Sequence, residues 1–264
     1  MDNDKPIITI RGLRKAYSGE EYVLNGIDLD ILPGQIIGYI GPNGAGKTTT
    51  VKILIGMISD FEGDITVLDK NIKTDPFDVK KNIGYVPENA ILYENLTPIE
   101  YLSFIGQLYG LAKDAVEAKS KKLLELFDLS ESADQRMSGF SKGMKQKVLI
   151  IGGILHNPDI IFLDEPLSGL DANTAIVIKE ILAGLAKQGK TIFYCSHIMD
   201  VVERISDRIV IIDKGRIIAD APFDELQSMT KGGGSLEKIF SQLTGGEEKE
   251  NVSGEFLDAL NGEE

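Results

Sequence analysis

The most restrictive feature of the sequence is the stretch Gly41-Pro42-Asn43-Gly44-Ala45-Gly46-Lys47-Thr48, which fits the phosphate-loop pattern of Gly, four residues, Gly, Lys and then Ser or Thr. A short apolar run at 35–40 predicts a strand before it, and the run at 49–55 predicts a helix after it. This order leaves backbone N–H groups pointing into one concavity at the positive end of the helix dipole. The expected ligand is a nucleotide polyphosphate.

The residues of the loop have different roles in binding. Glycine permits the tight turn and the close approach of phosphate oxygens. We expect the Lys47 ammonium at the outer phosphates and the Thr48 hydroxyl at a Mg²⁺ ion that bridges them. The residues expected to bind the nucleotide are Gly41, Pro42, Asn43, Gly44, Ala45, Gly46, Lys47, Thr48 and Thr49. The alternative is a glycine-rich turn that binds nothing, and the flanking strand and helix argue against it.

Composition excludes several classes of protein. The 264 residues are 42% hydrophobic, typical of a soluble globular protein, and no run approaches the roughly 18 apolar residues of a membrane-spanning helix. The first residues lack an export signal, so we expect a cytoplasmic location. A net charge of -13 argues against nucleic acid as the main partner. One Cys and two His exclude an internal disulfide and disfavour a His- or Cys-based metal cluster.

The periodicity of apolar residues predicts the fold class. Alternation at 7–10 and 23–31 predicts antiparallel strands, and the pattern from Thr97 to about Gly152 is helical, with Thr97, Pro98 and Glu100 as a helix start. Strands and helices then alternate as far as 212, and the apolar run at 160–163 indicates a parallel strand buried on both faces. We therefore predict an α/β fold: a P-loop NTPase core with a mainly parallel sheet, an N-terminal antiparallel β subdomain and an inserted helical subdomain at about 89–156.

The character of the chain changes after Pro222. Residues 224–229 and 235–243 have helical spacing, and Gly232-Gly233-Gly234 predicts a flexible joint between them. The segment 245–264 carries seven acidic residues and one Lys, so we expect it to be solvated and mobile. We divide the chain into a nucleotide-binding domain at 1–221 and a C-terminal extension at 222–264, partly helical with an acidic end.

An acidic pair ends the buried strand at 160–163. Asp164 follows the apolar residues, and a carboxylate at the carboxyl end of a core strand can hold Mg²⁺ directly or through water. Glu165 comes next and can take a proton from an attacking water. Taken alone, an acidic pair at a strand end can equally serve a turn or a helix cap.

With this pair the chain resembles an ATP-binding cassette (ABC) ATPase, and the likeness runs from about Ile7 to Ala219. The motifs of that family follow one another along this chain in the family's usual order. They are the aromatic Tyr17, the phosphate loop, 85–88, a signature at 140–144, 164–166, 168–171 and His197. Tyr17 is expected to stack on the adenine; Tyr22 is the competing choice, and a tyrosine that only covers the sheet is the plain alternative.

The resemblance implies a dimer, because in this family the signature of one subunit completes the nucleotide site of the other. Ser141 begins a helix whose N–H groups would face the partner's γ-phosphate, and Gly143 would permit close approach. His197 is expected to contact the γ-phosphate; the alternative is a loop histidine satisfied by the backbone. Asp171 resembles the residue that couples the two sites.

Two positions depart from the family pattern. Glu88 stands where most members have Gln; it can still bind Mg²⁺ but brings a negative charge toward the γ-phosphate. The usual signature Leu-Ser-Gly-Gly-Gln is replaced by Phe-Ser-Lys-Gly-Met at 140–144. Lys142 would add a cation near the partner's phosphates and offset the charge of Glu88.

The function implied is the ATP-hydrolysing subunit of a membrane transporter, with ATP and Mg²⁺, a second ABC subunit and a separate membrane-spanning subunit that holds the protein at the inner face of the membrane. Segments 140–147 and 235–243 resemble exporters of the ABC-2 type. A soluble ABC protein of translation or DNA repair is one alternative, disfavoured by the single cassette and the acidic charge. A regulatory module with little turnover is another, supported only by Glu88 and the altered signature.

Overall fold

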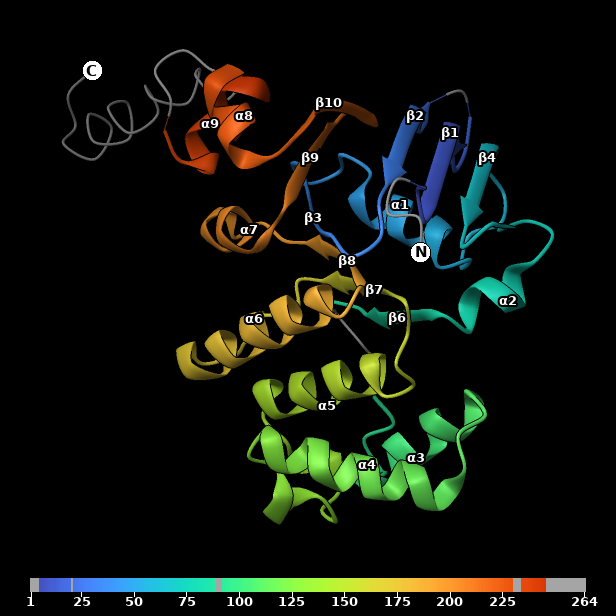
Figure 1. Cartoon of the computed structure of the whole chain (residues 1–264), viewed down its shortest axis with the longest axis vertical. Helices are drawn as coiled ribbons and strands as arrows, with labels where there is room; N and C mark the ends of the chain where they lie inside the picture. Colours follow the sequence, from blue (N-terminus) through green and yellow to red (C-terminus); the bar gives the residue numbers. More distant parts are fainter. Residues whose placement is uncertain (1–4, 20, 89–91, 230–233, 246–264) are drawn as a thin grey trace, which may run out of the picture.

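Two β-sheets and a group of helices make up the protein in the computed structural model, which describes residues 5–19, 21–88, 92–229 and 234–245 (Figure 1). The smaller sheet contains β1 (Ile8–Ala16), β2 (Tyr22–Ile31), β4 (Glu62–Val67) and β5 (Lys70–Asn71) in the order β2-β1-β4-β5, all antiparallel. Apolar side chains alternate along β1, so one face packs into the core. Strand β1 extends to Ala16, well beyond the alternation that the sequence shows at 7–10.

The larger sheet has six strands in the order β10-β9-β3-β8-β7-β6. They are β3 (Ile36–Ile40), β6 (Ile83–Val86), β7 (Ile160–Asp164), β8 (Thr191–Cys195), β9 (Arg208–Asp213) and β10 (Arg216–Ala221). Five are parallel, and only the edge strand β10 pairs antiparallel, with β9. Strand β10 was not predicted. It follows a turn in which Lys214 and Gly215 both have positive φ, as a two-residue hairpin requires.

Both faces of the larger sheet are covered, as predicted. In β3, Ile36 and Ile40 pack into one hydrophobic cluster, whereas Ile37 and Tyr39 pack into another. The first cluster is shared with α5 (Lys142–Ile154), α6 (Ala172–Lys187) and α7 (Met199–Ile205), and the second with α1 (Lys47–Leu54) and the smaller sheet. A strand buried on both faces shows no alternation, which explains its continuous apolar run.

The helices α3 (Pro98–Leu108) and α4 (Lys113–Leu126) lie with α5 at the end of the molecule opposite the smaller sheet (Figure 1). The predicted start of α3 is confirmed, since Thr97 and Glu100 form a reciprocal capping box. Two short 3₁₀ turns, Ser130–Ser132 and Met137–Gly139, connect α4 to α5. Helix α2 (Pro76–Lys80) lies between β5 and β6 in the chain. The α/β fold class is confirmed, and the domain boundaries stay a prediction.

The C-terminal extension contains the two helices that the spacing predicted, α8 (Phe223–Met229) and α9 (Leu236–Leu243). Leu236 and Ile239 of α9 are fully buried. The backbone N–H of Leu236 donates to the Glu203 carboxylate of α7 at 2.8 Å, so α9 is fastened to the core by both apolar packing and a capping bond. Residues 230–233 and the acidic segment 246–264, on which a joint and a mobile end were predicted, lie outside the described residues.

Candidate active site

The phosphate loop connects β3 to α1, as its flanking sequence predicted. Gly46 is the residue before α1, with φ of 108°, and a Cβ there would lie 2.5 Å from the Leu24 side chain. Only glycine fits this position, for reasons of both conformation and space. The first residue of α1 is Lys47, so the ammonium group is carried at the positive end of the helix.

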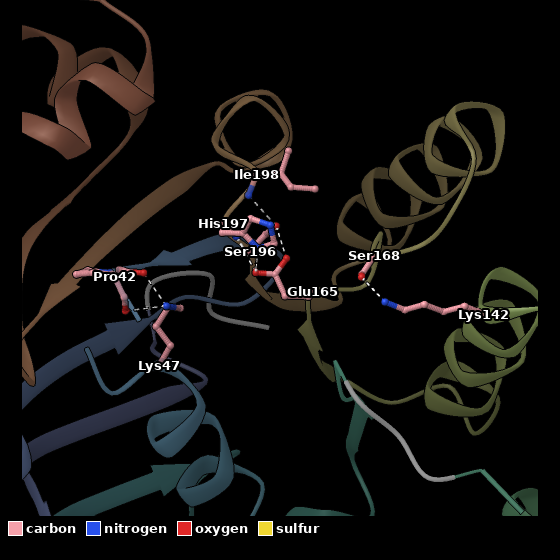
Figure 2. A network of polar contacts seen from close by, with 9 residues as sticks. Pro42, Lys47, Lys142, Glu165, Ser168, Ser196, His197 and Ile198 are labelled. Carbon is pink, nitrogen blue, oxygen red and sulfur yellow. Dashed lines mark hydrogen bonds and ion pairs between the residues drawn. The ribbon is translucent and has the colours of Figure 1, made fainter. Parts of the chain in front are cut away.

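The Lys47 ammonium points back into the loop (Figure 2). Its Nζ donates to the carbonyl oxygens of Gly41, at 2.6 Å, and Pro42, at 3.0 Å. Both partners are neutral backbone groups, so the charge of Lys47 is free to pair with an anion that enters the loop. The structure thus places Lys47 where the sequence required a phosphate-binding cation.

Asp164 ends β7, only 6% exposed. Burial, together with the neighbouring carboxylates of Glu88 and Glu165, raises the pKa of Asp164 to about 6. A divalent cation at this point would compensate that negative charge. The described residues contain no group of three or more His, Cys, Asp or Glu that could hold a metal alone. Mg²⁺ commonly takes one or two protein ligands and completes its shell with phosphate oxygens and water, so Thr48, Glu88 and Asp164 fit that ion.

Glu165 adopts a left-handed backbone conformation, with φ of 49°, that is uncommon for a residue other than glycine. Its Oε1 accepts hydrogen bonds from the backbone N–H and from Nδ1 of His197, both at 2.7 Å. The second carboxylate oxygen, Oε2, accepts from the Ser196 hydroxyl at 2.9 Å (Figure 2). His197 was predicted to contact the γ-phosphate and Glu165 to take a proton from the attacking water, and the structure shows that the two residues contact each other.

A cleft of about 240 Å³ brings these parts together. Parallel strands end at the same edge of a sheet, so β7, β8 and the loop after β3 all deliver side chains to it. The predicted site residues that line the cleft are Asn43, Gly44, Gly46, Lys47, Thr48, Thr49, Glu88, Asp164, Glu165 and His197. A larger hollow of about 540 Å³ lies beside β1, but none of the phosphate-loop residues line it.

Tyr17 lies at the margin of this site. Its side chain is 60% exposed, and its hydroxyl is 3.2 Å from the Thr49 hydroxyl of α1. The competing Tyr22 donates to Glu62 at 2.9 Å instead, on the smaller sheet. Tyr17 therefore contacts the phosphate-loop helix and Tyr22 does not, while the adenine-stacking role itself stays a prediction.

The signature residues stand apart from the cleft. Ser141 caps α5, and its hydroxyl accepts from the Met144 N–H at 3.2 Å, as a helix start predicted. A Cβ at Gly143 would lie 3.0 Å from the Gly169 carbonyl, so the backbones approach closely within one chain. Asp171 caps α6 and accepts from Thr174 N at 2.9 Å. Ser141, Gly143 and Asp171 do not line the cleft formed by this chain.

Two polar residues near the site were not predicted from the sequence. Ser196 holds Glu165, and the buried Gln146 side chain donates to the Pro166 carbonyl at 3.1 Å, which joins α5 to the loop after β7. The position of Ser196, between a buried strand and His197, was the available signal. Gln146 lies four residues after Lys142 on α5, with no pattern to mark it.

A phosphate loop on a parallel sheet, with a buried Asp ending a nearby strand and Glu and His at the same cleft, defines a P-loop nucleoside triphosphatase. A family model described as ABC transporter matches residues 24–168. The chain belongs to this family, as an ATP-binding subunit with ATPase activity. No helix in the described part of the chain is long and apolar enough to cross a membrane.

Curated relatives extend the likeness over most of the chain. The linearmycin resistance ATP-binding protein of Bacillus subtilis is 35% identical over 86% of this chain and 72% of its own length. The Nod factor export ATP-binding protein I of Cupriavidus metallidurans is 33% identical over 95% and 85%. A solved ATP-binding subunit of an ABC transporter superposes with a TM-score of 0.83 at 31% identity, covering 90% of this chain and 99% of that one.

Proposed function

We propose that this chain is the ATP-hydrolysing subunit of an exporter, and that it works against a separate membrane-spanning subunit at the inner face of the membrane. Two relatives bear names of export or drug resistance, and segments 140–147 and 235–243 resemble exporters of the ABC-2 type. ATP binding closes two cassettes over two nucleotides, hydrolysis reopens them, and the motion drives alternating access.

The observation that carries this proposal is the cleft in which Lys47, Glu165 and His197 meet. Lys47 and the loop N–H groups bind the phosphates, and Glu165 takes the proton of the attacking water. His197 contacts the γ-phosphate from the same side. Thr48, Glu88 and Asp164 would hold Mg²⁺, which supplies positive charge to the phosphate oxygens when bound.

The partner chain contributes the remaining contacts. Ser141 and Gly143 lie outside the cleft of their own chain, on an exposed helix start, so they are available to the nucleotide of a second copy or a related subunit. Asp171, at the start of α6, couples the two sites and Tyr17 stacks on the adenine. No nucleic acid partner is part of this proposal.

Replacing Glu165 by Gln tests the chemistry. Steady-state ATP hydrolysis should fall at least about 100-fold while ATP binding is kept. Equal rates would instead indicate a nucleotide-binding regulatory module. Hydrolysis by the wild type should also rise more than linearly with protein concentration, because two chains assemble each site; strict proportionality would contradict the shared site.

Membrane fractionation tests the transport role. Produced together with a membrane-spanning partner subunit, the chain should sediment with membranes, and produced alone it should not. Co-sedimentation with ribosomes would support a role in translation instead. Transport of a substrate into inverted vesicles would contradict an importer and support the exporter.

A further inference from the structure

Ser196 is a buried polar residue that none of the family marks includes. It stands between Cys195, the last residue of β8, and His197, and it is only 1% exposed. Its hydroxyl donates to Glu165 Oε2 at 2.9 Å and accepts from the Ile198 N–H at 3.1 Å (Figure 2). The hydroxyl thus donates one bond and accepts another, and these two contacts fix its orientation.

The two oxygens of the Glu165 carboxylate have different environments. Among the described residues Oε1 accepts two bonds, both from His197, whose side chain is 76% exposed and stands at the cleft. Oε2 is bonded by the buried hydroxyl of Ser196. Contacts at both oxygens stop rotation of the carboxylate about its terminal bond. Ser196 therefore turns Oε2 toward the interior and leaves Oε1 on the side that substrate reaches.

The main chain supports the same arrangement. The Glu165 N–H donates to the Cys195 carbonyl at 2.9 Å, so the ends of β7 and β8 are joined beside the side-chain bond. The left-handed conformation of Glu165 points its side chain across β8 toward the loop that begins at Ser196. A general base must be held within a fraction of an ångström of its productive position, and this pair of contacts supplies that restraint.

We propose that Ser196 is a positioning residue for ATP hydrolysis, which holds Oε2 so that Oε1 receives the proton of the attacking water. In that step the water oxygen bonds to the γ-phosphorus, the bond from phosphorus to the ADP oxygen breaks, and the proton passes to the Oε1 lone pair that His197 Nδ1 contacts in this structure. The inference rests on the proposed role of Glu165 as the base. Ser196 itself does not contact the nucleotide.

Three variants of the full chain test this role by steady-state kinetics. Ser196→Ala should lower kcat about tenfold, the size of a lost hydrogen bond to a charged group, and leave KM for ATP within about twofold. Ser196→Thr keeps the hydroxyl and should retain most of kcat. Ser120→Ala removes another fully buried serine hydroxyl, on α4, that has no hydrogen-bond partner among the described residues, and should leave both constants unchanged.

A double variant separates this inference from the proposed function. In a Glu165→Gln background, Ser196→Ala should cause no further loss of the residual rate, because the group it positions has been replaced. A further tenfold loss there would overturn the positioning role, as would an unchanged kcat in Ser196→Ala or a Thr variant as slow as the Ala variant. If Glu165→Gln hydrolyses ATP like the wild type, the base assignment itself fails.

Discussion

Lys142 Nζ donates to the Ser168 hydroxyl at 2.9 Å, which joins the start of the signature helix α5 to the loop after β7 in the same chain (Figure 2). The sequence indicated a cation near the partner's phosphates at this position. A cation in the first turn opposes the helix dipole, and the described residues offer it no carboxylate partner. The hydrogen bond between Lys142 and Ser168 therefore links the start of α5, which Ser141 caps, to the loop that leads to Asp171.

A double-mutant cycle measures that link. Lys142→Ala and Ser168→Ala should each lower ATP hydrolysis a few-fold, and the double variant no more than either, because both remove one exposed hydrogen bond worth about 1 kcal/mol or less. Lys121→Ala on α4 is the control for loss of a surface lysine. A Lys142→Ala effect at least tenfold larger than that of Ser168→Ala would favour a direct phosphate contact instead.

The sequence predicted those elements whose signal is local. Continuous apolar runs located β3 and β7, and the Thr97 capping pattern located α3. Strand β10 was missed because its sequence, Arg-Ile-Ile-Ala-Asp-Ala, neither alternates between apolar and polar residues nor forms an unbroken apolar run. The continuation of β1 to Ala16, the residue before Tyr17, depends on its pairing with β2, which local pattern does not determine.

For the site, motif spacing was enough to place Lys47, Glu165 and His197 in one cleft, because the carboxyl ends of parallel strands share an edge. The partners of Ser196 and Lys142 depend on contacts between segments that are 31 and 26 residues apart in sequence. Such contacts follow from tertiary packing and leave no periodic pattern. Residues that act across a dimer are placed by a second chain, and their roles stay predictions.

Replacing Glu88 by Gln tests the departure from the family pattern. Glu88 is exposed at the cleft, so its charge is partly screened by solvent, although it still contributes to the raised pKa of Asp164. We expect ATP binding to persist and turnover to change by less than about tenfold, or roughly 1.4 kcal/mol of barrier. Steady-state hydrolysis with a nucleotide-binding control measures both. Complete loss of hydrolysis would show that Glu88 is indispensable.

Removing the cap of α3 tests the stability of the helical region. The Thr97 hydroxyl accepts from Glu100 N at 3.2 Å, and Glu100 accepts in return from Thr97 N at 2.8 Å. Thr97→Ala should lower the free energy of unfolding by about 1 kcal/mol in urea titrations. Ser235→Ala is a matched control, because Ser235 precedes α9 without a side-chain capping bond. Equal losses in the two variants would contradict the capping argument.

His156 lies at the junction between the helical region and the larger sheet. Its ring stacks on that of Tyr109, the residue that follows α3, with the ring centres 3.6 Å apart, and Nε2 is 3.0 Å from the Ile83 carbonyl of β6, so Nε2 carries the proton. Its Nδ1 is buried without a partner among the described residues. Burial lowers the pKa of His156, and the nearby ammonium groups of Lys119 and Lys190 lower it further. Lys190 is itself paired with Asp159. The hydrogen bond to the Ile83 carbonyl raises the pKa, but the net shift is downward.

This lowered pKa predicts that acid weakens the junction. The unfolded chain binds a proton at His156 near its ordinary pKa of 6.5, whereas the folded chain resists it, so stability is complete above that value and declines as pH falls through it. His156→Phe keeps a ring against Tyr109 and cannot titrate. Between pH 8 and 5 the free energy of unfolding should therefore decline more steeply for the wild type than for His156→Phe in parallel urea titrations. Identical slopes would mean that His156 is protonated equally well in both states, which its burial beside two lysines opposes.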